Sequence, residues 1–199
     1  MSETEAAAPP TPPPMGIDPR SPEFLNLRKA CEMGSARGCS MFGVGLTQDG
    51  AASGKRILKF LRMGCERGDA DGCYVMSKLQ ILQRVPGGAD AAFRNSYTAC
   101  RMGQVQACTQ TGLMFIEGMG CKADMSKGLT VLLNACDKLE SGQSCFQAAR
   151  VIGALADDGM HIAWKQTEGS EELNTQEMMR GLLRKGCAFK NEDACKYMN

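Results

Sequence analysis

The sequence predicts an all-α protein, a solenoid of stacked helical hairpins, and three observations support this prediction. Ten of the 11 cysteines in the 199 residues form five couples, whose first members lie 34, 35, 36 and 51 residues apart. A period in the mid-thirties is typical of helical repeat arrays. Amphipathic stretches, such as residues 57–61 and 129–133, precede the couples, and Gly-rich segments separate the hairpins. The pattern therefore indicates a helix B, a tight turn and then the helix A of the next unit.

The first 20 residues are expected to be disordered, because six of the eight prolines fall within residues 1–19 and the segment is acidic. It has no apolar region of a secretory signal and no Arg-rich amphipathic pattern of a mitochondrial presequence. Ser21 as N-cap and Pro22 at the first helical position predict a helix start, although SPEF at 21–24 also resembles a cloning scar. The solenoid is predicted to span residues 21–199.

The turns within the couples carry glycine next to or just after the first cysteine, at Gly34, Gly68 and Gly103. Four couples have seven intervening residues and one has eight. The couples are Cys31/Cys39, Cys65/Cys73, Cys100/Cys108, Cys136/Cys145 and Cys187/Cys195. Because glycine adopts conformations that reverse the chain, these segments predict tight turns between helices.

The links from helix A to helix B are also predicted from local signals. Asp90 and Asp124 are expected N-caps of the following B helices. The fourth unit is longer than the others and holds a polar insertion near residues 158–172, after which Asn174 and Glu177 occupy capping-box positions. The array thus contains about four to five repeats. It has truncated ends, because the first repeat lacks helix A and the last stops shortly after Cys195.

Geometry favours disulfides within the couples. Residues eight apart on one helix are separated by about 12 Å, whereas a disulfide requires Cα atoms within about 7 Å. A bridge therefore forms only if the chain reverses, and it would staple helix B to the next helix A. Zinc ligation and reduced packing cysteines are the alternatives, although structural zinc prefers cysteines two to four residues apart.

The third unit, ACTQTGLMFIEGMGCKADMSKGLTVLLNAC, resembles the Sel1-like repeat. The positions that carry the resemblance are Ala107, Cys108, Gly112, Gly118, Gly120, Asp124, Lys127, Ala135 and Cys136. The cysteine couples make the chain similar to the cysteine-rich branch of this family over about residues 24–199. The resemblance implies a right-handed α/α superhelix of bridged hairpins.

The same branch includes secreted bacterial Hcp proteins and a mitochondrial cytochrome c oxidase assembly factor. The resemblance implies a non-enzymatic scaffold of the mitochondrial intermembrane space that binds respiratory-chain assembly components and enters through the oxidative-folding import machinery. Two alternatives are a secreted Hcp-like β-lactam-binding hydrolase and a cytosolic Sel1-repeat adaptor with reduced cysteines. A net charge of +1 gives no case for nucleic acid, and no apolar run is long enough for membrane insertion.

The chain offers few candidate chemical residues. Cys121 stands outside the couples and is expected to be an unpaired thiol, either filling a small apolar position or acting in a mixed disulfide, in redox chemistry or as a soft ligand. His161 is the single histidine and lies in the polar insertion. No catalytic or metal site and no cofactor are predicted, but the resemblance admits haem with His161, Cys121 or a methionine as axial ligand. Methionines expected in the core are Met41, Met63, Met76, Met102 and Met114.

Overall fold

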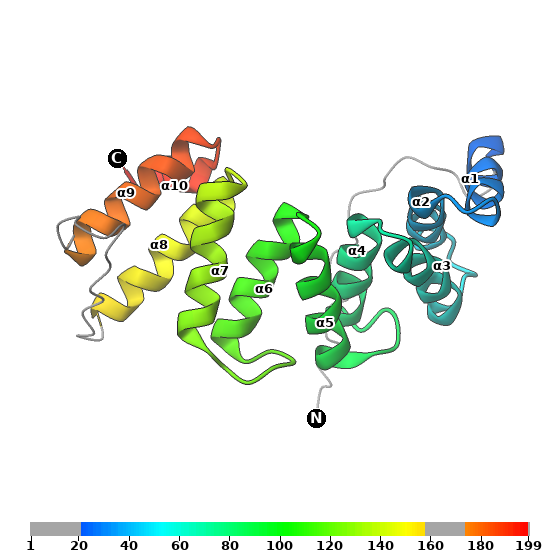
Figure 1. Cartoon of the computed structure of the whole chain (residues 1–199), viewed down its shortest axis with the longest axis horizontal. Coiled ribbons are helices and arrows are strands. Elements are labelled where there is room, and N and C mark those ends of the chain that lie inside the picture. The colour runs from blue at the N-terminus through cyan, green and yellow to red at the C-terminus, as the bar shows by residue number, and fades with distance from the viewer. Residues whose placement is uncertain (1–20, 158–173, 199) are drawn as a thin grey trace, which may run out of the picture.

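The structure is a computed structural model that describes residues 21–157 and 174–198, and this part of the chain is helical throughout (Figure 1). The helices are α1 (Pro22–Glu32), α2 (Ala36–Leu46), α3 (Gly54–Glu66), α4 (Ala70–Ile81), α5 (Gly88–Arg101), α6 (Val105–Glu117), α7 (Met125–Lys138), α8 (Gly142–Asp157), α9 (Thr175–Ala188) and α10 (Glu192–Lys196). The all-α solenoid is confirmed.

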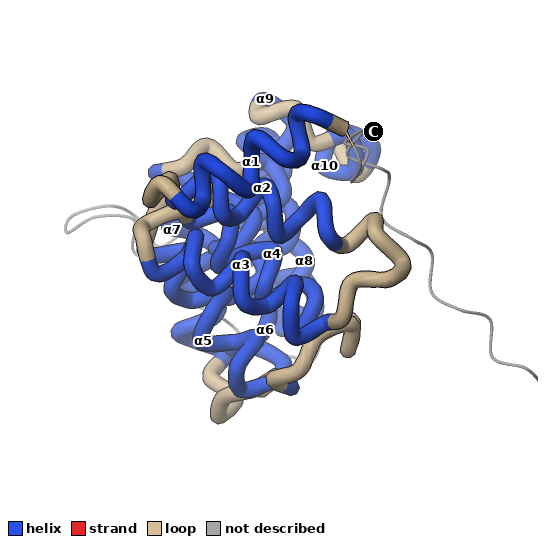
Figure 2. Tube along the Cα trace, turned by 90° about the vertical axis from the view of Figure 1, so that its right-hand side faces the viewer, coloured by secondary structure: helices blue, strands red, loops and turns tan. Residues whose placement is uncertain are grey.

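Successive helices pack in the order that the repeat predicts. The most extensive contacts join α2 to α3, α4 to α5, α6 to α7 and α8 to α9, which are the A and B helices of one unit. Neighbouring A helices also touch, as in α2 with α4 and α6 with α8, whereas neighbouring B helices are not among the closely packed pairs. The A helices therefore form the closely spaced row of the array. Figure 2, turned by 90°, shows the helices nested behind one another along the array.

The first helix begins as the sequence predicts. The Ser21 hydroxyl accepts a hydrogen bond from the Phe24 backbone N–H at 3.2 Å, and Pro22 occupies the first turn. The ring of Phe24 stacks on Phe42 with centroids 4.5 Å apart, and Phe42 meets Phe60 edge to face at 4.6 Å. An aromatic cluster thus joins α1, α2 and α3 at the start of the array.

The core runs between the A and B helices of each unit. The amphipathic stretches predicted at 57–61 and 129–133 bury Ile57, Leu61 and Leu132, and the last two are fully buried. Burial of each large apolar side chain contributes about 1.5–3 kcal/mol relative to leaving it in water. Glycines allow close approach, because a Cβ at Gly112 would lie 2.7 Å from Leu132 Cγ and 3.0 Å from the Gly128 carbonyl oxygen.

Each B helix ends in a three-residue turn whose middle residue has a left-handed backbone conformation. The φ angles of these residues are 102° at Gly34, 99° at Gly68, 88° at Gly103, 50° at Glu140 and 62° at Lys190. The last residue of each turn donates its N–H to the carbonyl of the residue before the first cysteine. These bonds are Ser35 to Ala30, Asp69 to Gly64, Gln104 to Ala99, Ser141 to Ala135 and Asn191 to Gly186. The same backbone hydrogen bond therefore closes the turns at Glu140 and Lys190, where the middle residue is not glycine.

Five disulfides staple the turns, one for each couple, as the fold prediction requires. The Cα–Cα distances are 4.4 Å for Cys31–Cys39, 4.8 Å for Cys65–Cys73, 4.5 Å for Cys100–Cys108, 4.7 Å for Cys136–Cys145 and 4.6 Å for Cys187–Cys195. All lie in the range that a disulfide spans without moving the backbone. The chain reversal inferred from the spacing is therefore present in every unit.

The fourth couple accommodates its extra residue inside the B helix. Cys136 lies two residues before the end of α7, whereas Cys31 and Cys65 each lie one residue before the end of their helices. The turn still has three residues, and Ser141 still bonds to Ala135, now across a separation of six residues. The additional residue thus lengthens the last helical turn and leaves the bridge geometry unchanged.

Besides Ser21, the predicted caps are right at two places and wrong at one. The Asp124 carboxylate accepts from the Lys127 N–H at 2.9 Å, and Asn174 and Glu177 form the capping box of α9. Asp90 does not cap α5, because the helix already begins at Gly88 with Gly87 as its N-cap. Asp90 instead lies in the first turn, where a carboxylate is favoured by the helix dipole.

Several predictions lie outside the described residues. These are the disorder of residues 1–20, the insertion near 158–172 and the position of His161. Within the described ranges, no helix combines the length and the apolar composition that crossing a lipid bilayer requires.

Candidate protein-binding groove

A hollow follows α6 on the A-helix row, with α4 on one side and the start of α8 on the other. Its volume is about 570 Å³. We call it the α6 groove. Its lining residues are Tyr74, Ile81, Val105, Gln106, Thr109, Gln110, Leu113, Met114, Glu117, Met119, Ser141, Gly142 and Gln143. The 13 residues of α6 give the groove a length of about 20 Å, which matches about six residues of extended peptide.

Hydrogen bonds between A helices hold the groove in shape. Gln110 Nε2 donates to Ser77 Oγ at 2.6 Å, which joins α6 to α4. Ser77 donates in turn to the Ala92 carbonyl at 2.7 Å, which ties α4 to α5. On the other side, the hydroxyls of Thr109 and Ser144 lie 2.6 Å apart in a buried contact between α6 and α8. Buried polar groups with partners fix one arrangement of the helices, so the groove is preformed.

The groove combines apolar surface with neutral hydrogen-bonding groups. Val105 and Leu113 are half-buried, while the amides of Gln106 and Gln143 are exposed. Each amide both donates and accepts, so these side chains can pair with a peptide backbone. Burial raises the pKa of Tyr74 above its usual value, and its phenol is therefore neutral at physiological pH. The Lys78 ammonium lies 5.6 Å from the centroid of the same ring.

The charged lining of the groove is sparse. Its one carboxylate is that of Glu117, which is exposed. Across the described residues, no group of three or more His, Cys, Asp and Glu side chains is placed to hold a metal ion.

The cysteine pairs lie outside the groove, at the edge of the array formed by the turns. Residues that follow the B helices cover two of them. Arg67 Nη1 donates to the Cys31 carbonyl at 2.8 Å and lies 3.0 Å from Cys39 Sγ. Met102 Sδ lies 3.9 Å from Cys73 Sγ. The unit that follows thus shields the disulfide of the unit before it.

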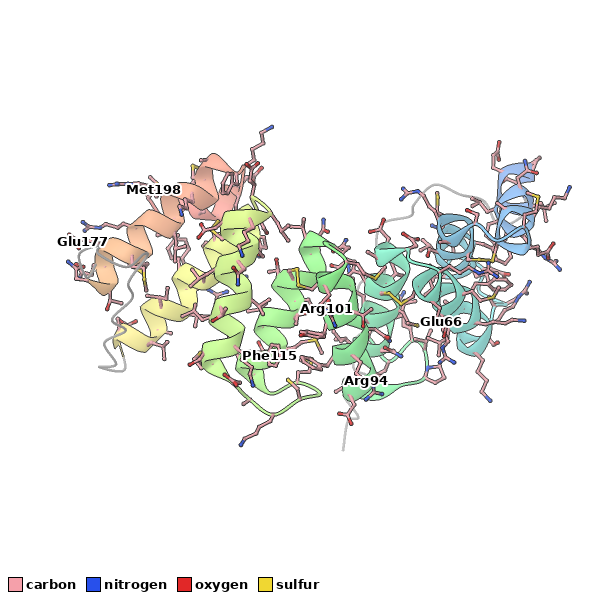
Figure 3. All side chains as sticks on the ribbon, in the orientation of Figure 1. Glu66, Arg94, Arg101, Phe115, Glu177 and Met198 are labelled. Carbon is pink, nitrogen blue, oxygen red and sulfur yellow. A yellow bond between two sulfur atoms is a disulfide. The ribbon has the colours of Figure 1, made fainter. Side chains whose placement is uncertain are left out.

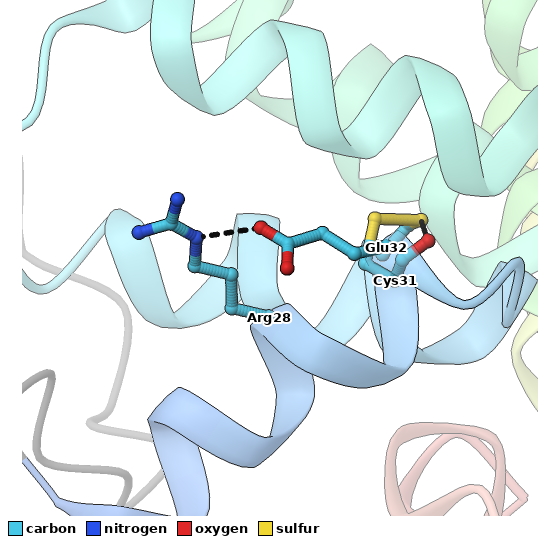
Figure 4. A network of polar contacts seen from close by, with 4 residues as sticks. Arg28, Cys31 and Glu32 are labelled. Carbon is cyan, nitrogen blue, oxygen red and sulfur yellow. Dashed lines mark hydrogen bonds and ion pairs between the residues drawn. A yellow bond between two sulfur atoms is a disulfide. The ribbon is translucent and has the colours of Figure 1, made fainter.

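The first disulfide is also flanked by a surface ion pair (Figure 4). Arg28 Nε lies 2.9 Å from Glu32 Oε1, one helical turn apart on α1, and both side chains are more than half exposed. Exposed pairs of this kind stabilise a helix by a few tenths of a kcal/mol. The disulfide and the helix packing, rather than this pair, therefore hold the first turn.

Cys121 lies in the segment between α6 and α7 and forms no disulfide. Its thiol donates toward the Met114 carbonyl with a sulfur–oxygen distance of 3.5 Å. Burial, and then the neighbouring Asp124 carboxylate, raise the pKa of this thiol. A protonated thiol is a poor nucleophile and a poor soft ligand, so the surroundings favour the packing role over the redox role.

The prediction of core methionines holds for Met76 and Met114, which are 3% and 2% exposed. Met41 and Met63 are only half-buried. Met102 is wrong as a core residue, because it is the residue that follows α5 and is 38% exposed. It packs on a disulfide instead of filling the interior.

The sequence analysis did not find the α6 groove. A signal was present, because the apolar residues of α6 are not confined to the face that carries Gly112. Leu113 lines the groove and also packs against the core cluster of α7, α8 and α9. A helix that is apolar around most of its circumference is typically covered on both faces.

Comparison with solved structures assigns the architecture. A protective antigen of uropathogenic Escherichia coli, c5321, which displays an SLR fold, matches with a TM-score of 0.68 and 18% identity. The match covers 88% of this chain and 35% of c5321. A Sel1 repeat protein from Oxalobacter formigenes gives a TM-score of 0.68 at 16% identity, covering 88% of this chain and 65% of the other.

Cysteine rich protein B (HcpB) of Helicobacter pylori matches with a TM-score of 0.50 and 17% identity, covering 64% of this chain and 97% of HcpB. No protein-family model and no curated protein matches the sequence. The chain spans about a third of the length of c5321 and just under two thirds of the Oxalobacter protein. At these identities the similarity concerns the fold. The chain therefore has the fold of Sel1-repeat proteins, stapled by one disulfide per turn.

Proposed function

We propose that the protein is a non-enzymatic scaffold that binds an extended segment of a partner protein in the α6 groove. The observation that supports this role is the groove itself, a preformed surface on the A-helix row that combines apolar side chains with glutamine amides. The hydrogen bond from Gln110 to Ser77 helps to fix its shape. Helical solenoids characteristically offer such extended surfaces to partners. The apolar side chains supply affinity, and the amides can pair with a peptide backbone.

The proposed setting is the mitochondrial intermembrane space, with respiratory-chain assembly components, and in particular those of cytochrome c oxidase, as partners. The five disulfides support an oxidising compartment, because glutathione and thioredoxin keep cytosolic cysteines reduced. Oxidation of the pairs during import would both fold the solenoid and retain it there. The similarity of the cysteine pattern to that of the mitochondrial assembly factor supports the more specific assignment.

Site-specific photocrosslinking in cells tests the binding surface. A photoreactive residue replaces Gln106, which is exposed in the α6 groove, and in a control variant it replaces Thr98, which is exposed on α5 outside the groove. We expect a discrete adduct with a respiratory-chain assembly component from position 106 only. Equal adducts from both positions, or none from position 106, would contradict the proposal.

Protease protection tests the compartment separately. In intact mitochondria the protein should resist added protease, and rupture of the outer membrane alone should make it sensitive. Recovery of the protein in the cytosolic fraction would overturn the proposed localisation. The photocrosslinking experiment would still test the proposed binding surface independently.

A further inference from the structure

The outer face of α3 carries a cluster of three cations that the α6 groove does not use. Lys55, Lys59 and Arg62 surround a hollow of about 380 Å³, whose remaining lining is Leu58, Met63 and Pro86. We call this the basic hollow. The spacing of four and three residues places the three cations on one stripe of the helix.

No acidic side chain neutralises this stripe within the described ranges. The ion pairs there involve other residues: Arg28 with Glu32, Arg37 with Asp71, Lys127 with Asp124, Lys185 with Asp137 and Lys196 with Asp193. Glu66, which Figure 3 labels, continues the stripe one turn beyond Arg62 as the last residue of α3.

The repeat does not require these charges. Counted from the first cysteine of each couple, the positions of Lys55, Lys59 and Arg62 in α3 correspond to Asp90, Arg94 and Tyr97 in α5. In α9 they correspond to Glu177, Gly181 and Arg184. The packing of a B helix is therefore satisfied without three cations, and their presence in α3 is specific to this unit.

We propose that the basic hollow binds an acidic peptide segment that also carries a large apolar residue. Within the described ranges the three cations form no ion pair and are available to attract carboxylates, and Lys59 Nζ lies 5.9 Å from the centroid of the Phe60 ring. The hollow between them is lined by Leu58, Met63 and Pro86, which can receive an aliphatic side chain. The observations favour a peptide over a membrane surface, because the apolar side of α3 is already committed to the core. Ile57 and Leu61 are 7% and 0% exposed and cannot enter a lipid layer.

A nucleic acid fits the same surface less well. Affinity for nucleic acid comes from many phosphate contacts made along a charged track. The first and last of the three cations are seven residues apart along the helix, or about 11 Å, and a glutamate follows them. An apolar floor adds nothing to a phosphate contact but stabilises a buried leucine side chain.

Fluorescence anisotropy with the full chain tests this proposal. The probe is a short fluorescein-labelled peptide with two leucines flanked by aspartates and glutamates. Matched probes replace the leucines by serine or the acids by lysine. We expect saturable binding of the first probe that weakens as salt is raised, with at least tenfold weaker binding of both matched probes.

Two charge-matched variants assign the site. Lys55→Glu/Lys59→Glu/Arg62→Glu should weaken binding of the acidic probe at least tenfold. Lys29→Glu/Lys122→Glu/Lys138→Glu makes the same change in net charge at exposed positions elsewhere and should bind like the parent chain. Circular dichroism checks that both variants remain helical. If the first triple variant loses its helical signal, Lys59→Ala, an exposed truncation on the same stripe, replaces it and should weaken binding measurably.

The proposal is overturned by three results. These are absence of saturable binding of the acidic probe, equal losses in the two triple variants, and tighter binding of phosphatidylserine-containing vesicles or a DNA duplex through the same three residues. The proposal is independent of the α6 groove, because variants at Gln106 or Leu113 should leave binding of this probe unchanged.

Discussion

Removal of the Cys65–Cys73 disulfide should destabilise the array by an amount that can be calculated from its position. The bridge closes a loop with a sequence separation of 8, for which loop-closure entropy in the unfolded chain gives about 2.5 kcal/mol at 25 °C. Cys73 is fully buried, so its truncation to alanine adds a small cavity cost. Cys65→Ala/Cys73→Ala should therefore lose about 2.5–4 kcal/mol.

The single variants show whether the loss comes from the bond. Cys65→Ala and Cys73→Ala each break the same disulfide, so each should lose about 2.5 kcal/mol and the double variant should lose little more. Urea denaturation under oxidising conditions measures the unfolding midpoints, and Cys121→Ala serves as the control for removal of an unbonded thiol. Strictly additive losses, or a double variant as stable as the parent chain, would refute a stabilising disulfide at this turn.

Other predictions concern packing, capping and the free thiol. Gly112→Val places side-chain atoms against Leu132 and the Gly128 backbone and should lower the free energy of unfolding, measured by urea denaturation, by about 1–3 kcal/mol. Gly181→Ala in α9 has nothing within 4 Å of the added Cβ and should raise the free energy of unfolding by up to about 1 kcal/mol. A Gly112 variant more stable than the Gly181 variant would contradict the packing. Asn174→Ala removes the capping box of α9 and should lower stability by about 1 kcal/mol, visible as faster hydrogen exchange in the first turn; unchanged exchange would mean that the cap contributes nothing. Because burial and Asp124 raise the pKa of Cys121, its thiolate fraction at neutral pH is small, so alkylation by iodoacetamide should be slower than for a free cysteine and should accelerate at alkaline pH. Fast alkylation at neutral pH would contradict the protonated state.

The fold was predictable because the cysteine couples mark a chain reversal in every unit. A separation of eight residues is too long for a bridge within one helix and suitable for a bridge across a turn. The order of B helix, turn and A helix followed from the amphipathic stretch before each couple and the turn residues within it. Asp124 and Asn174 were predictable as caps, because each stands directly before a periodic apolar stretch.

Other features depend on packing that one sequence does not display. Asp90 failed as a cap because the two glycines before it let the helix begin earlier. Glu140 and Lys190 take the left-handed position that glycine fills in three other turns, so a glycine pattern alone misses two turns. Met102 has the character of a core residue, but the turn places it on the disulfide of the preceding unit.

The α6 groove and the basic hollow were likewise only partly predictable from the sequence. The apolar residues Val105 and Leu113 of α6 were visible in the sequence, but the groove also depends on how α4 and the start of α8 are placed on either side of α6, which only the stacked array sets. The three cations of α3 were equally visible, yet their shared hollow depends on Pro86 from the α4–α5 segment. Residue type was predictable at both places, and the arrangement in space was not.

The central claim is that each turn of the solenoid is locked by its own disulfide. Mass spectrometry of the protein purified from its cells, alkylated before and after reduction and digested without reduction, tests this claim most directly. The structure predicts five linked peptide pairs, each joining cysteines eight or nine residues apart, with Cys121 alone modified before reduction. Modification of all 11 cysteines before reduction, or links between different units, would contradict the account.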